Sequence, residues 1–281
     1  IATAAAPAVV EVSVVTVEGV RRGSGVMARS DGLVLTSARL VDQAETLRVR
    51  WADGVSVAAE LAGIDAVTGL AAVTVGDGGH PTPTFDLTPP EPGDRTFAVG
   101  AGQDGSEPIV RTGVVAATDA RPSLATGVLV ELIETDAPVG DEVDGGALLD
   151  DQGNLRGVCI AVGDGDEGWA VPADVAVRVA DDLRRLGRVD RGWLGVAGTR
   201  VLGDGPVPSG FVVEEVASGS PAERVGLRVG DVVIAVGDDR VRSLDDIRGA
   251  LTLTRPGQTI TVEAARGGAT LSVDVTLATA P

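Results

Sequence analysis

The stretch GSGVMARSDGLVLTSARLV, residues 23–41, decides the fold of the first part of this chain. Its centre, Leu33-Val34-Leu35, is a short apolar run that follows the turn signal Asp31-Gly32. Similar β-branched or alternating runs occur at 9–15, 47–51 and 70–75, and Gly and Asp residues separate them. Many short strands at such spacing are typical of a β-sandwich or barrel. The pattern therefore predicts an all-β architecture through about residue 170.

The remaining segments divide the chain further. Residues 76–94 are rich in Pro and Gly, which indicates a linker between two β halves, at about 1–80 and 95–172. A helix is predicted at 173–186, because apolar residues recur there at helical spacing and Gly187 ends the pattern. A second unit begins near residue 191, with strands expected around 211–216, 231–236, 259–265 and 270–277 and a helix near 244–253. Ser243 and Asp246 form a capping-box-like start to that helix, and the mixture indicates a small α+β domain.

Composition excludes several classes of function. The net charge of −18 repels phosphate backbones, so nucleic acid is not expected as a partner. The single cysteine, Cys159, stands in an apolar run, which predicts a buried, inert thiol and neither a disulfide nor a thiolate metal site. No apolar stretch reaches transmembrane length. Because the sequence begins at Ile1, we expect it to be a fragment whose targeting or anchoring segment lies upstream.

Acidic residues in two loops leave a calcium site open as an alternative, because hard cations need converging carboxylates. No EF-hand-like spacing is present, so solvated acidic loops are favoured over a metal site, and no cofactor is expected. The residues concerned are Asp136, Asp141, Glu142, Asp144, Asp164, Asp166 and Glu167.

The chain resembles the HtrA group of trypsin-like proteases in several segments that follow in family order. Residues 23–41, 63–73 and 135–150 are similar to the segments that carry the catalytic histidine, aspartate and serine, and 168–172 to the end of the second barrel. Residues 191–196 and 219–233 resemble the PDZ domain of the family. The resemblance implies a mainly β fold: a chymotrypsin/trypsin-like double β-barrel at 1–188, closed by the helix 173–186, and a PDZ domain at 191–281.

The resemblance places the triad at Arg39, Gly69 and Asp144, and the oxyanion hole at the backbone amides of Glu142 and Asp144. A guanidinium cannot accept a proton near pH 7, glycine has no side chain, and an ionised carboxylate has no proton to surrender as a nucleophile. We therefore expect no enzyme but a non-catalytic pseudoprotease. We also expect the Arg39 guanidinium to pair with Asp144, or failing that with Glu142 or Asp141.

A serine protease with a displaced nucleophile, Ser37 or Ser24, is the alternative. The loop at 163–168 is also shorter than the specificity loop of the family, so the substrate pocket itself is expected to be reduced.

The PDZ resemblance implies peptide binding. The C-terminus of a peptide would add as a strand beside residues 195–199, and backbone amides of the loop Trp193-Leu194-Gly195-Val196 would hold its carboxylate. Leu194, Val196, Ile247 and Leu251 would line a pocket for the last apolar side chain. The expected partners are unfolded or C-terminal peptides, bound by a sensor, scaffold or regulator.

Family members are extracytoplasmic, often tethered to the membrane, and trimeric through N-terminal aromatic residues. Residues 1–20 contain no aromatic residue, so a monomer is expected. We expect an extracytoplasmic location, in the periplasm or cell envelope, with membrane contact only through the missing anchor.

Overall fold

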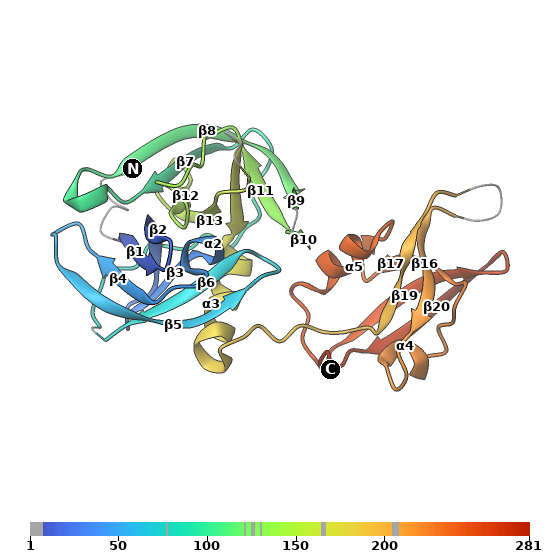
Figure 1. The fold of residues 1–281 in the computed structure, drawn as a ribbon. Helices are drawn as coiled ribbons and strands as arrows, with labels where there is room; N and C mark the ends of the chain where they lie inside the picture. Colours follow the sequence, from blue (N-terminus) through green and yellow to red (C-terminus); the bar gives the residue numbers. More distant parts are fainter. Residues whose placement is uncertain are drawn as a thin grey trace. The chain divides into compact units, whose positions relative to one another are not determined.

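A computed structural model describes residues 8–76, 78–120, 122–124, 127–129, 131–163, 167–203 and 208–281. The chain divides into two compact units, Ile1–Val189 and Asp190–Pro281. The first unit contains two closed six-stranded barrels, and the second contains an open sheet with short helices (Figure 1). The expected architecture, a double β-barrel followed by a small unit of strands and helices, is therefore present.

The first barrel closes in the strand order β1-β2-β3-β6-β5-β4. Val10, Val12 and Val14 alternate along β1, and all three are fully buried in the barrel core. A one-turn helix, α2, follows β3 directly and brings residues 38–41 to the barrel rim. The elements are β1 (Val9–Thr16), β2 (Gly19–Arg29), β3 (Leu33–Ser37), α2 (Ala38–Val41), β4 (Thr46–Arg50), β5 (Ser56–Asp65) and β6 (Leu70–Val75).

The second barrel closes in the order β11-β14-β13-β12-β7-β8, and β9 and β10 form a separate two-stranded ribbon. Its core contains Ile133, Leu148 and Cys159. Cys159 is fully buried, as its apolar run predicted, and this burial raises the pKa of its thiol. The elements are β7 (Arg95–Gly100), the 3-10 turn η2 (Gln103–Gly105), β8 (Ile109–Ala120), β9 (Ser123–Leu124), β10 (Gly127–Val128), β11 (Leu132–Thr135), β12 (Ala147–Leu149), β13 (Leu155–Ile160) and β14 (Gly168–Pro172).

Helix α3 (Ala173–Leu186) packs against strands of both barrels. Val175, Val179 and Leu183 are buried in one cluster with Leu70 of the first barrel and residues of the second. Gly187 ends the helix in the left-handed conformation, with φ 70°, and its N–H donates to the Leu183 carbonyl. The helix thus has the limits that its periodicity predicted, and it holds the two barrels together.

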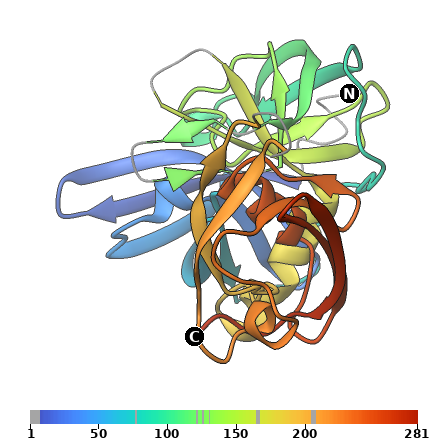
Figure 2. The same ribbon diagram turned by 90° about the vertical axis from the view of Figure 1, so that its right-hand side faces the viewer.

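The second unit is a sheet in the order β15-β16-β17-β19-β20, with β18 paired to β17. The sheet is drawn in orange to red in Figures 1 and 2. Helix α5 begins at the predicted cap, where the Ser243 hydroxyl accepts a hydrogen bond from the Asp246 N–H. The elements are β15 (Val196–Val201), β16 (Gly210–Val216), α4 (Pro221–Arg224), β17 (Val232–Val236), β18 (Asp239–Arg240), α5 (Leu244–Leu251), β19 (Thr259–Arg266) and β20 (Ala269–Thr276).

Within the part of the chain that the structure describes, no helix is both long enough and apolar enough to cross a membrane.

Candidate functional site

Arg39 and Asp144 meet at the cleft of the first unit. Arg39 stands in α2, two residues after the end of β3, and half of its side chain is exposed. Its Nη2 atom lies 3.3 Å from Asp144 Oδ2 and 2.6 Å from Asp141 Oδ1. The predicted pairing of Arg39 with these carboxylates is confirmed.

The Asp144 carboxylate is only 2% exposed, although its arginine partner reaches solvent. Burial raises the pKa of this carboxyl above its ordinary value, and the hydrogen bond from the Ala161 N–H and the charge of Arg39 offset part of that effect. The Ala161 N–H lies 2.7 Å from Asp144 Oδ1, and Ser37 also forms a side-chain hydrogen bond to this carboxylate. Asp144 is therefore held by groups from two segments, residues 37–39 and residue 161.

Gly69 lies beside the same cleft through its backbone. Its φ is +75°, a left-handed conformation that suits glycine. The Ala38 N–H donates to the Gly69 carbonyl over 2.8 Å, so position 69 contacts the residue directly before Arg39. The structure thus brings positions 39, 69 and 144 into one region, and two of them contribute side chains. Their correspondence to the triad stays a prediction.

The predicted oxyanion-hole residues lie in the turn that precedes β12. The Asp144 N–H already donates to the Gly140 carbonyl at 3.0 Å. The Glu142 carbonyl accepts a hydrogen bond from Ser24, and its side chain lies 3.7 Å from Arg111. Of the two amides assigned to the oxyanion hole, that of Asp144 is therefore already hydrogen-bonded within the turn.

Neither serine proposed as a displaced nucleophile is free to react. Ser24 is fully buried; its hydroxyl donates to the Glu142 carbonyl at 2.8 Å and accepts from the Ala101 N–H at 2.9 Å. Ser37 is 2% exposed and bonds to Asp144. The structure does not favour the alternative of a displaced serine.

The cleft itself is a hollow of about 400 Å³, and its lining includes Arg21, Arg22 and Arg39 together with Asp141 and Asp144. Arg21 donates to the carbonyls of Arg39 and Asp42, which fixes the backbone of α2. The arrangement can neutralise charge and hold the turn at 140–145 against α2.

Within the described residues, no three His, Cys, Asp or Glu side chains gather closely enough to hold a metal ion. Asp136 instead accepts a hydrogen bond from the Val114 N–H at 2.6 Å. Asp164 and Asp166, and with them half of the loop 163–168 that was predicted to be short, lie outside the described residues.

The loop before β15 presents backbone amides. Trp193 exchanges backbone hydrogen bonds with Ala278, so its own N–H is occupied. Among the described residues, the N–H groups of Leu194 and Gly195 have no acceptor, while their carbonyls accept from Ala222 and Ala217. Gly195 has φ +88°, and successive amides around a left-handed residue form a concavity for anions.

The apolar residues assigned to the peptide pocket lie in or against the core of the second unit. Leu194, Ile247 and Leu251 are 3%, 3% and 7% exposed and belong to the core of the second unit. Val196 is half-buried and packs against that core. Their role in peptide binding stays a prediction.

Comparisons with known proteins match both units. A model of the trypsin-like peptidase domain matches residues 23–158, and a PDZ domain model matches residues 177–277. The serine endoprotease DegS of Salmonella typhimurium is 31% identical over 272 residues, which cover 91% of this chain and 76% of the relative. The chain belongs to the HtrA family of serine endoproteases.

Other members of the HtrA family match over the same length. A probable periplasmic serine endoprotease, DegP-like, of Chlamydia trachomatis is 32% identical over 92% of this chain and 54% of its own length. The chain thus spans about half the length of the first curated relatives that it matches. The solved HtrA-type protease AlgW with tripeptide is 29% identical with a TM-score of 0.81, covering 100% of this chain and 96% of that chain. The solved serine endoprotease from Yersinia pestis is 28% identical with a TM-score of 0.74, covering 100% and 97%.

The comparisons overturn one expectation from the sequence. The residue types at 39, 69 and 144 led us to expect that the chain is not an enzyme. That assignment is wrong at the level of the family, because the HtrA relatives that match across both units are named serine endoproteases. The inference failed because it rested on three side chains alone and gave too little weight to the similarity of the whole chain to proteases.

Proposed function

We propose that this HtrA-family chain recognises the C-termini of extended polypeptides through its PDZ domain, and that it acts as a sensor, scaffold or regulator. One observation carries the proposal: the backbone N–H groups of Leu194 and Gly195 lie side by side without an acceptor among the described residues. Two such amides can donate to the two oxygens of a terminal carboxylate. Leaving buried N–H groups unpaired costs free energy, which a bound carboxylate recovers.

Strand β15, which follows these amides, supplies the second support. It pairs with β16 on one side and stands at the edge of the sheet order. An extended peptide can therefore add as a further antiparallel strand, with main-chain hydrogen bonds that are independent of its sequence. A similar protein, the HtrA-type protease AlgW, has been solved with a tripeptide and with a decapeptide.

We place this function outside the cytoplasm. Relatives of Chlamydia trachomatis, Halomonas elongata and Pseudomonas putida are named as periplasmic endoproteases. Unfolded chain ends in such a compartment are the substrates that the proposed site suits.

The test compares one apolar-ended peptide with a free carboxylate and with an amidated terminus, titrated against the full chain. The free acid is expected to bind at about micromolar strength and the amide at least tenfold more weakly. In NMR spectra, the amide signals of Leu194 and Gly195 should shift on binding. The amide of Trp193, which already donates to Ala278, serves as the neighbouring control. Equal binding of acid and amide would overturn the proposal.

Peptide-bond hydrolysis is a second candidate function, favoured by the names of the relatives. It is measured as turnover of unfolded casein after repeated purification, for the natural sequence and for Asp144→Asn. Loss of turnover in the variant would place the reaction at the Arg39–Asp144 cleft. Turnover that disappears on purification would remove this candidate.

A further inference from the structure

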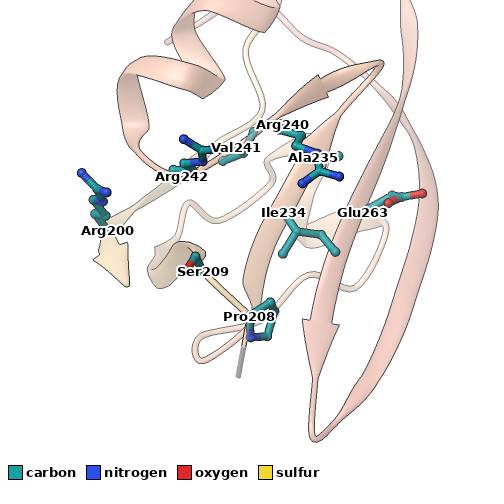
Figure 3. A pocket seen from close by; sticks show the side chains of 9 residues that line it. All are labelled: Arg200, Pro208, Ser209, Ile234, Ala235, Arg240, Val241, Arg242 and Glu263. Carbon is teal, nitrogen blue, oxygen red and sulfur yellow. The ribbon is translucent and has the colours of Figure 1, made fainter. Parts of the chain in front are cut away.

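The second unit contains a hollow lined by arginines. Its volume is about 600 Å³, and Arg200, Arg240 and Arg242 contribute three positive charges to its lining against the single carboxylate of Glu263 (Figure 3). All three arginines are exposed. The excess of positive charge stands out in a chain whose net charge is −18.

Among the residues that the structure describes, none of these three guanidinium groups has a hydrogen-bond or ion-pair partner. Elsewhere in the same unit, Arg248 pairs with Asp245 and Arg266 with Asp231. The hollow therefore gathers arginines whose charge is available to a ligand.

Arg240 and Glu263 flank the same residue of β17. In the sheet, Ala235 pairs with Arg240 on one side and with Glu263 on the other, so their backbones are two strand spacings apart. Among the described residues, no ion pair joins the two side chains.

The hollow adjoins the far end of the edge strand. Arg200 lies near the end of β15 and pairs in register with Phe211, whose side chain is in the core face that α5 covers. Arg242 directly precedes the Ser243 cap of α5. Figure 3 shows Arg242 beside the end of β15 that carries Arg200.

Strand geometry relates this hollow to a bound peptide. From Val196 to Arg200 the strand advances about 13 Å, at roughly 3.3 Å per residue. An antiparallel peptide whose last residue stands opposite Val196 brings the residue four before its C-terminus opposite Arg200. The next residue upstream stands opposite Val201, the last residue of β15.

We propose that Arg200 and Arg242 select peptides with acidic side chains four and five residues before the C-terminus. This inference rests on the proposed function, because it assumes the peptide register along β15. Guanidinium groups recognise carboxylates through paired, charge-assisted hydrogen bonds, so Asp or Glu at these positions fits the hollow. An acidic segment also lowers the repulsion among the clustered arginines.

The experiment uses the full chain and two peptides with the same apolar, free C-terminus. One carries Glu-Glu at the fourth and fifth positions before the terminus, and the other carries Gln-Gln. The natural sequence should bind the Glu peptide about fivefold more tightly at low salt, and the difference should shrink above about 0.3 M salt.

The variant Arg200→Gln/Arg242→Gln should bind both peptides equally and keep the affinity of the natural sequence for the Gln peptide. Arg228→Gln, an exposed arginine just before β17, is the matched control and should keep the discrimination. Since these side chains are exposed, unchanged melting temperatures will show that the variants fold.

Two outcomes overturn the inference. The natural sequence binds both peptides equally, or the double variant still prefers Glu. In either case a retained difference between free and amidated termini leaves the proposed function standing. If amidation has no effect on either peptide, the proposed function fails first.

Discussion

The Nη2 atom of Arg39 lies 3.3 Å from Asp144 Oδ2, and the two residues differ sharply in their surroundings. Arg39 is half exposed and has a second partner in Asp141, whereas Asp144 is almost completely buried. The pair therefore consists of a buried carboxylate, which has lost its hydration, and a cation that retains part of its own. Desolvation dominates the behaviour of the carboxylate.

The free energy of unfolding of the first unit should depend on pH, because the buried Asp144 carboxylate has lost its hydration. The folded state raises the pKa of Asp144, so the folded protein binds a proton more readily than the unfolded chain. Asp144 therefore makes its full contribution to stability below about pH 3.9, the pKa of the carboxyl in the unfolded chain. This contribution is lost as pH rises through the higher pKa of the folded state. Asp144→Asn should remove that decline.

The pH dependence of stability is measured by urea unfolding between about pH 4 and pH 7. Hydrogen exchange of α3 reports the unfolding of the first unit. Asp141→Asn is the control, because this residue contacts the same arginine but its side chain is 80% exposed. It should leave the slope unchanged. A slope that is identical in the natural sequence and Asp144→Asn would contradict the prediction.

Asp231 in the second unit should behave in the opposite way. Burial alone would raise the pKa of its carboxyl, but hydrogen bonds from the Arg266 side chain and the Arg228 N–H lower it below the ordinary value. Its contribution to stability is therefore present above pH 3.9, roughly, and is lost as pH falls through the lower folded value.

Arg266→Met should cost about 2 kcal/mol near neutral pH, because it leaves a carboxylate that is 1% exposed without its guanidinium partner. Arg248→Met, which breaks the more exposed pair with Asp245, should cost about 0.5 kcal/mol or less. The loss of stability of each variant is measured by urea unfolding, with hydrogen exchange of β17 as the probe. Equal losses for Arg266→Met and Arg248→Met would contradict the prediction.

Gly195→Ala should destabilise the second unit and abolish peptide binding. A Cβ atom at this position would lie 2.2 Å from Ser220 Cβ, and the φ of +88° adds strain. Gly219→Ala is the matched control, because Gly219 has φ +73° but nothing within 4 Å of an added Cβ. We expect losses of about 3 and 1 kcal/mol respectively, measured by urea unfolding.

Fluorophosphonate labelling tests the two buried serines. A probe of this kind reacts with an activated, accessible hydroxyl. Since Ser24 and Ser37 are buried and hydrogen-bonded, peptide mapping should find neither labelled. Labelling of either residue in the folded protein would contradict this prediction and support a protease that uses a displaced nucleophile.

Local sequence signals predicted much of the fold. The run Leu33-Val34-Leu35 formed a fully buried strand, and the periodicity of 173–186 formed α3 with Gly187 at its end. The Ser243 cap appeared where predicted. These elements follow from neighbours in sequence, so local patterns suffice. Strand β2 had no such signal, because its Arg21 and Arg22 interrupt the apolar pattern.

Long-range burial could not be predicted in the same way. Glu11 alternates with valines in β1 and is 3% exposed, and its carboxylate lies near Arg22 and Arg50 of two neighbouring strands. At the candidate site, the matched positions predicted the Arg39–Asp144 pair. Asp141 was named only as a second choice, and the fact that it lies closer to Arg39 than Asp144 does depends on how the loop folds. The same holds for the amides of Leu194 and Gly195, which have no acceptor among the described residues.

Strand β15 has no partner strand on one side of its backbone within the sheet, and such an exposed edge can cause aggregation. An uncapped edge can join the edge of a second molecule and start a growing β-ribbon. Gly198 in the middle of the strand weakens such stacking, since it has no side chain to pack. Arg200 near the end places a charge where a neighbouring molecule would have to bury it. The same arginine therefore protects the protein in concentrated solution, and its removal should lower the concentration at which the chain aggregates.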